Sequence, residues 1–144
     1  MGTRSVASTA LGVATAGALS GAVGFAAAAQ TPLTLELNRL ESVDGGCRVD
    51  LVVEAGPESV DVLTLDLVLF NPAGLILRRL AVEAGPAPAG KRRVRAFLAE
   101  GLSCDSIGSA LVNGVIACEI GGSVATDCER SITTRSRLPV ALVN

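Results

Sequence analysis

The chain has 144 residues, which suits a single domain. Hydrophobic residues make up 49% of the chain and charged residues 18%, so the composition can build a core and argues against long disorder. The absence of His, Trp and Tyr removes the commonest general base, the commonest metal ligand and most aromatic stacking surfaces, and a net charge of −2 argues against a nucleic-acid-binding protein.

The first 29 residues have the features of a secretory signal peptide. Arg4 is their only charge, and the stretch from Ser5 to Ala29 is uncharged and built of small and apolar residues. Ala27 and Ala29 form the small-residue pair of an A-x-A cleavage site. We therefore expect cleavage after Ala29 and a single exported domain over residues 30–144.

The alternative for the same stretch is an uncleaved membrane helix. It is long enough to span a bilayer, and Gly17 and Gly21 form a GxxxG pair. Ala and Gly dominate the stretch, however, and it has no flanking basic cluster, which favours cleavage. A single Arg leaves both the general secretory route and the twin-arginine route open.

Most of the remaining chain alternates between apolar and polar residues with a period of two, which is typical of half-buried strands. The pattern is clearest over 33–38, 47–54 and 62–69, and further strands are predicted over 75–82 and 91–98. In the strand at 91–98, Val94, Ala96 and Leu98 alternate with Arg93, Arg95 and Phe97. Segments 111–120 and 126–135 are predicted to form a last hairpin, and 138–143 a closing edge segment.

Turn residues separate these strands. Asn71-Pro72-Ala73-Gly74 predicts a tight hairpin turn, Gly85 to Gly90 predicts an irregular loop, and Cys104 to Gly108 predicts a turn or a single helical turn. About seven short strands and no long helix indicate an all-β protein. We expect an immunoglobulin-like β-sandwich.

Four cysteines lie after the leader: Cys47, Cys104, Cys118 and Cys128. An even number in a small exported domain predicts two disulfides, for which three pairings exist. We favour Cys118–Cys128, because both positions fall on expected neighbouring strands joined by a Gly121-Gly122-Ser123 turn, and this leaves Cys47–Cys104. Without a CxxC motif or any His, no metal site is expected.

A basic strand is the main candidate for binding. Lys91, Arg93 and Arg95 share one face of the strand at 91–98 and could bind an acidic partner or anionic lipid. The alternative is an edge strand whose charges prevent aggregation. Arg135 and Arg137 would extend the basic patch if their strand lay alongside.

Catalytic groups are not evident. The carboxylates are scattered and are expected on the solvated surface: Asp44, Glu54, Glu58, Asp61 and Asp66. Ser106 in Cys104-Asp105-Ser106 has no His to act as its base, and nothing places the only lysine, Lys91, beside it. We therefore expect a protein that is not an enzyme and that needs no cofactor.

Several segments together resemble a family of small exported alphaproteobacterial proteins that are labelled by a Tat-type signal sequence domain. The segments are 33–40, 46–48, 51–53, 65–70, 78–82, 104–108, 111–118 and 136–139. More loosely, the strand–turn–strand pattern followed by a Gly-Pro loop and a Lys-Arg strand is similar to FxLYD-type envelope domains. These resemblances imply a β-sandwich in the envelope and no catalytic residues.

The expected function is that of a non-enzymatic periplasmic module that binds another envelope protein through an exposed edge strand or the basic strand. The alternative is an accessory subunit of a larger complex, tethered to the membrane by an uncleaved leader. No nucleic acid is expected as a partner, and the membrane is a partner only if the leader is retained.

Overall fold

The computed structural model describes residues 1–3 and 32–144. The body of the predicted leader, its cleavage site after Ala29 and the Gly17–Gly21 pair lie outside the described residues. In the part that is described, no helix has the length and apolar character needed to cross a membrane.

Strands make up most of the described chain. Their bounds are β1 Leu33–Val43, β2 Gly46–Ala55, β3 Val60–Phe70, β4 Ile76–Glu83, β5 Arg92–Glu100, β6 Ser109–Ile120, β7 Ser123–Val124, β8 Ile132–Ser136 and β9 Ala141–Val143. Two single-turn helices accompany them, the 3-10 helix η1 (Cys104–Ser106) and α1 (Cys128–Ser131). Of the two alternatives expected over Cys104 to Gly108, a turn or a single helical turn, the structure has the helical turn.

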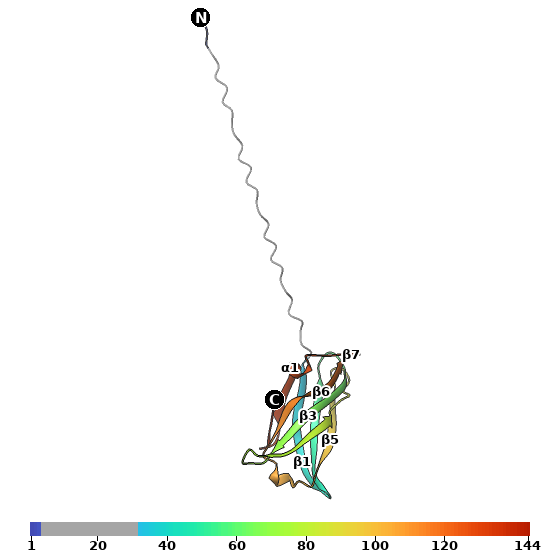
Figure 1. Cartoon of the computed structure of the whole chain (residues 1–144). Helices are drawn as coiled ribbons and strands as arrows, with labels where there is room; N and C mark the ends of the chain where they lie inside the picture. Colours follow the sequence, from blue (N-terminus) through green and yellow to red (C-terminus); the bar gives the residue numbers. More distant parts are fainter. Residues whose placement is uncertain (4–31) are drawn as a thin grey trace.

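The strands form two sheets that stack into an elongated sandwich (Figure 1). Sheet A has the order β5-β2-β1-β8, and sheet B has the order β4-β3-β6-β7 with β9 also beside β6. The predicted all-β sandwich is confirmed. β2 lies beside β5 and β3 beside β6, an arrangement compatible with the expected immunoglobulin-like build.

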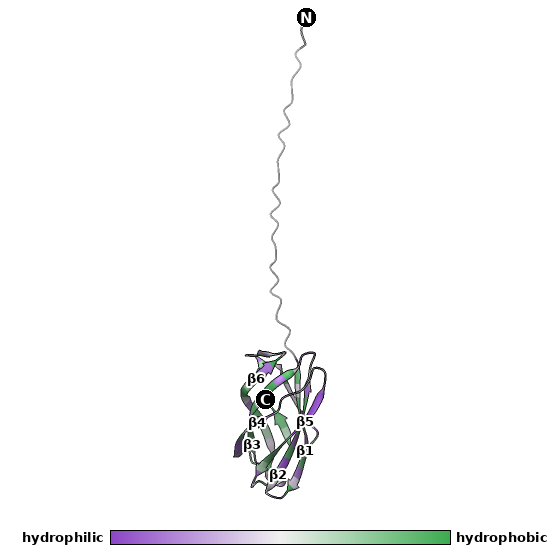
Figure 2. Ribbon diagram, turned by 90° about the vertical axis from the view of Figure 1, so that its right-hand side faces the viewer, coloured by the Kyte–Doolittle hydropathy of each residue, from purple (hydrophilic) through white to green (hydrophobic). Residues whose placement is uncertain are grey.

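The core lies between the two sheets and follows from the period-two alternation. One face of each central strand is buried to 3% exposure or less, namely Leu33, Leu35, Leu37, Cys47, Val49, Leu51, Val53, Leu63, Leu65, Leu67 and Leu69. Burying each leucine side chain stabilises the fold by about 2 kcal/mol. Figure 2 shows hydrophobic and hydrophilic residues alternating along these strands.

The register of β5 decides which of its two faces points into the sandwich. Arg93 lies opposite Val53 and Arg95 opposite Leu51, and both partners are core residues. The odd-numbered face of β5 therefore points inward. Val94, on the other face, is 62% exposed.

The hairpin predicted from 111–120 and 126–135 is wrong. β6 turns at Gly121 and Gly122, whose φ angles are 58° and 80°, into the two-residue β7. The chain then forms α1 and crosses to sheet A, where β8 runs parallel to β1 with Ile132 opposite Leu33. Alternation identifies a strand but carries no information about its partner, and the crossing buries Ile132 in the core. The closing segment expected over 138–143 contributes β9, which runs parallel to β6.

Both expected disulfides are present. Cys47–Cys104 joins the start of β2 to η1, with a Cα–Cα distance of 5.0 Å. Cys118–Cys128 joins β6 to the first residue of α1, with a Cα–Cα distance of 6.4 Å. The pairing is confirmed, although Cys128 begins a helix and does not lie on a neighbouring strand. Two disulfides indicate an oxidising compartment outside the cytoplasm.

Candidate functional site

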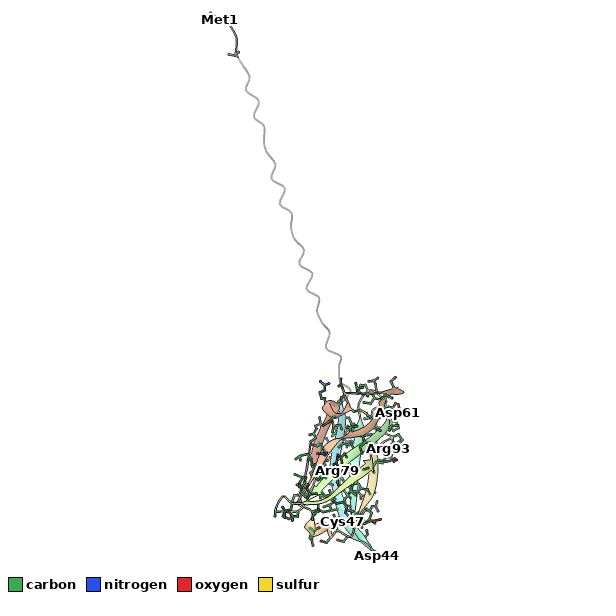
Figure 3. The ribbon with its side chains drawn as sticks, viewed as in Figure 1. Met1, Asp44, Cys47, Asp61, Arg79 and Arg93 are labelled. Atoms are coloured by element: carbon green, nitrogen blue, oxygen red, sulfur yellow. A yellow bond between two sulfur atoms is a disulfide. The ribbon has the colours of Figure 1, made fainter. Side chains whose placement is uncertain are left out.

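The predicted basic residues lie at one edge of sheet A. Arg93 and Arg95 are on β5, the last strand of that sheet, and Lys91 directly precedes it. Arg93 is labelled in Figure 3, at the side of the body. Because the odd-numbered face of β5 points inward, these side chains stand at the open side between the two sheets.

Arg95 is held by the backbone of the loop that follows β4. Its Nη2 donates to the carbonyl oxygen of Pro86 at 2.5 Å, and its Nε donates to that of Ala84 at 3.4 Å. Arg93 instead donates from Nη1 to the carbonyl oxygen of Arg92 at 3.0 Å. The inward face and the loop contacts of Arg95 argue against an open basic patch for an acidic partner, and they keep these charges off the outer face of β5.

Arg135 and Arg137 do not extend this basic group. Arg135 is on β8, which is the opposite edge of sheet A, with β1 and β2 between it and β5. Both side chains bind the carboxylate of Glu36 on the outer face of sheet A, at 2.6 Å from Arg135 Nε and 3.1 Å from Arg137 Nε.

The hydrogen bonds at the two ends of β5 show which of its residues direct their N–H and C=O groups away from β2. The Ala55 N–H donates to the Lys91 carbonyl at 3.1 Å, so positions 55 and 91 form a hydrogen-bonded pair. Such pairs recur at every second residue of an antiparallel ladder. At the far end of β5, the Gly101 N–H donates to the Gly45 carbonyl at 2.8 Å, so the hydrogen-bonded residue is odd-numbered there as well. The odd-numbered residues of β5 therefore bond to β2, and the even-numbered residues direct their N–H and C=O groups away from it.

We call these even-numbered residues the β5 edge: Arg92, Val94, Ala96, Leu98 and Glu100. Their side chains all lie on the outer face of sheet A, and three apolar residues occupy the middle. Val94 is 62% exposed and Leu98 is 39% exposed. A shallow hollow of about 300 Å³ lies beside them, lined by Val43, Arg48, Ala96, Phe97 and Leu98.

The sequence alone does not single out the β5 edge as a site. Its signal is the order basic, apolar, apolar, apolar, acidic at every second position. That order is visible in the sequence, but it has meaning only when β5 is known to be an edge strand whose even-numbered residues face outward.

Glu36 organises a polar cluster on the outer face of sheet A. Its side chain is only 5% exposed and accepts hydrogen bonds from Asn38 Nδ2 at 2.8 Å, Arg135 and Arg137. The bond from Asn38 and those from the two arginines lower the pKa of Glu36, against the opposing effect of burial. Arg135 also reaches Glu54, which in turn binds Arg92 at 2.9 Å. No local signal links these residues, because Glu36 and Arg135 are 99 positions apart.

Asp66 is not the solvated carboxylate that we expected. It is 8% exposed on the outer face of β3 and binds Arg79 on β4 through both oxygens, at 2.7 and 2.5 Å. Asn113 Nδ2 donates to it at 2.6 Å. The Arg79 bonds and then the Asn113 bond lower the pKa of Asp66. Asp66 is enclosed because β3 lies between β4 and β6, which supply Arg79 and Asn113.

The other expected surface carboxylates are scattered as predicted. Figure 3 places Asp44 and Asp61 at opposite ends of the body. Asp44 is exposed, while Asp61 accepts hydrogen bonds from Ser59 Oγ at 2.8 Å and the Gly122 N–H at 2.7 Å. Over residues 1–3 and 32–144, no group of three or more His, Cys, Asp or Glu residues is placed to hold a metal ion.

Ser106, considered as a nucleophile, lies at the end of η1. Its hydroxyl donates to the carbonyl oxygen of Ser103 at 2.7 Å. This bond belongs to the helical turn, in which the Ser106 N–H also donates to Ser103. Cys104, two positions before it, is bonded to Cys47 and offers no free thiol. The Ser106 hydroxyl donates to a main-chain carbonyl and not to a general base, so it is not activated as a nucleophile.

These features define a disulfide-bonded β-sandwich domain with an open edge strand. No protein-family model matches the chain, and no curated protein matches it. The chain resembles a solved structure from Escherichia coli, described as the structural characterization of IrmA. The TM-score is 0.57 and the sequence identity 15%, over 73% of this chain and 92% of that chain. A likeness at this identity supports the β-sandwich fold alone.

Proposed function

We propose that this protein is a non-enzymatic periplasmic binding module, and that the β5 edge is the surface through which it takes up a strand of another polypeptide of the envelope. The observation that carries the proposal is the direction of the main-chain groups of β5. An unpaired row of N–H and C=O groups is a template for strand addition, and exposed apolar side chains beside it supply specificity.

The side chains on this edge suit a strand partner better than an anionic ligand. Arg95 donates from Nε and Nη2 to loop carbonyls, and Arg92 is paired with Glu54. The middle of the edge is apolar, with Val94 and Leu98 exposed. A partner strand would cover these apolar residues and satisfy the outward main-chain groups in one step.

The periplasmic compartment is part of the same proposal. Two disulfides and an A-x-A leader agree with export, and the resemblance to small exported proteins points the same way. Tethering to a membrane complex through residues 5–29 stays a prediction from the leader sequence. The intact mass of the purified protein tests it, because a mass that begins at Gln30 excludes a retained leader.

Photo-crosslinking in the native cell tests the docking surface. A photoreactive amino acid is placed at Ala96, in the middle of the β5 edge, or at Ala81, which is an exposed alanine on the edge strand β4 of the other sheet. We expect an adduct of one defined envelope polypeptide from position 96 and none from position 81. The proposal fails if position 96 forms no adduct, or if only position 81 does.

A further inference from the structure

The β5 edge is complementary to itself. We propose that it pairs antiparallel with the β5 edge of a second copy of this chain, which joins two copies of sheet A into one continuous sheet across a twofold axis. This inference rests on the proposed function, because it uses the same edge and assigns the occupant.

The self-complementarity appears when Ala96 is placed on the twofold axis. Arg92 then lies opposite Glu100 of the second copy, and Val94 lies opposite Leu98 of the second copy. The twofold repeats each pair, so the interface gains two ion pairs at its ends and two apolar pairs inside them. Arg92 already binds Glu54 at 2.9 Å on the same face, and its side chain is 62% exposed and accessible to a second carboxylate.

The main-chain parity agrees with this register. Residues that face each other across the axis are all even-numbered, and these are the residues whose N–H and C=O groups point away from β2. Each such pair exchanges two hydrogen bonds, which makes about ten along the interface. Between them, Arg93 lies opposite Ala99 and Arg95 opposite Phe97 of the second copy, so no like charges face each other.

Other registers lose the complementarity. A shift by two residues in one direction places Arg92 opposite Leu98 of the second copy, and a shift in the other direction places Val94 opposite Glu100. Parallel pairing places Arg92 beside Arg92 and Glu100 beside Glu100. Only the antiparallel register centred on Ala96 matches charge with charge and apolar with apolar, which is the property expected of a specific isologous interface.

Sedimentation velocity tests the inference with the full chain, expressed with its leader and purified as the cell exports it. The concentration is varied from about 1 to about 500 µM, a range that spans weak and moderate dimers. We expect a concentration-dependent doubling of mass. Ala96→Pro removes an N–H that points out of the domain and leaves the pairing with β2 intact, so the dimer should weaken by about 10-fold or more while the domain stays folded.

Charge reversal supplies the matched test. Arg92→Glu and Glu100→Arg each place like charges at both ends of the interface, so each variant alone should dimerise about 10-fold more weakly. In a dimer of one copy of each variant, the glutamate introduced at position 92 lies opposite the arginine introduced at position 100. At the other end of the interface, the unchanged Arg92 and Glu100 still form the native pair. The mixture should therefore form a mixed dimer with affinity near that of the unchanged protein. Circular dichroism and thermal midpoints establish that each variant is folded.

Two results would overturn the inference. One is a single-copy mass at every concentration, and the other is a dimer that Ala96→Pro and both charge reversals leave unchanged. A single-copy mass together with an adduct of a different polypeptide at position 96 would reject the second copy and retain the proposed docking edge. An adduct made only of two copies of this chain would support the second copy and reject a different envelope protein as the partner at this edge.

Discussion

The two disulfides close loops of very different length, and their removal should therefore cost the fold different amounts. Cys47–Cys104 spans 57 positions, whereas Cys118–Cys128 spans 10. Replacing each pair by alanines avoids an unpaired thiol and a buried hydroxyl. A longer closed loop restricts the unfolded chain more strongly, so the first pair should matter more.

The magnitude follows from the entropy of loop closure. A loop of 57 positions gives about 4.2 kcal/mol and a loop of 10 positions gives about 2.7 kcal/mol, a difference of about 1.5 kcal/mol. The two loops do not overlap in the sequence, so their effects should add to about 7 kcal/mol. A domain of this size has a free energy of unfolding of about 5–15 kcal/mol, and full reduction should bring it close to unfolding.

The assay is guanidinium chloride unfolding of the unchanged protein and the two double-alanine variants, followed by circular dichroism. Each variant loses one sulfur atom that is no more than 2% exposed, at Cys47 or Cys128. The second cysteine is buried in the short-loop pair (Cys118) and half-buried in the long-loop pair (Cys104), so lost packing works against the expected order. We expect the Cys47→Ala/Cys104→Ala variant to be the less stable of the two. Greater destabilisation by Cys118→Ala/Cys128→Ala would refute the loop-entropy reasoning.

Three further predictions concern single residues. The pKa of Glu36 lies below its ordinary value of 4.5, so its contribution to stability is complete above pH 4.5 and is lost as the pH falls through the lowered pKa. Glu36→Gln should therefore lower the thermal midpoint at pH 7 and make the midpoint depend less on pH in acid. A pH dependence equal to that of the unchanged protein would contradict this. Arg95→Ala should cost about 1 kcal/mol because it removes the contacts to the loop after β4, whereas Arg93→Ala should change the free energy of unfolding by less than about 0.5 kcal/mol, and equal losses in urea unfolding would contradict the difference. Gly108→Ala places a Cβ 2.6 Å from a backbone nitrogen of the β3–β4 turn and should cost about 2 kcal/mol or more, whereas Gly114→Ala meets no atom within 4 Å and should be close to neutral in the same assay.

Much of the candidate site was outside the reach of sequence analysis, for a definite reason. The alternation over 91–98 predicted a strand, and Lys91, Arg93 and Arg95 were expected on one of its faces. Whether that face points inward depends on pairing with β2, which is 38 positions away at the Arg92–Glu54 contact. The clusters at Glu36 and Asp66 likewise join side chains from strands that are distant in the sequence.

Local patterns in the sequence by themselves determined the strands of the core, the Asn71–Gly74 turn, and the presence of two disulfides, because alternation, turn residues and cysteine number are local or compositional properties. Only the tertiary structure decided the partner of each strand, the crossing of β8 to sheet A, and the outward direction of the β5 edge. Each of these depends on register between distant segments, and a shift of one residue there would exchange the buried and exposed faces without altering any local pattern.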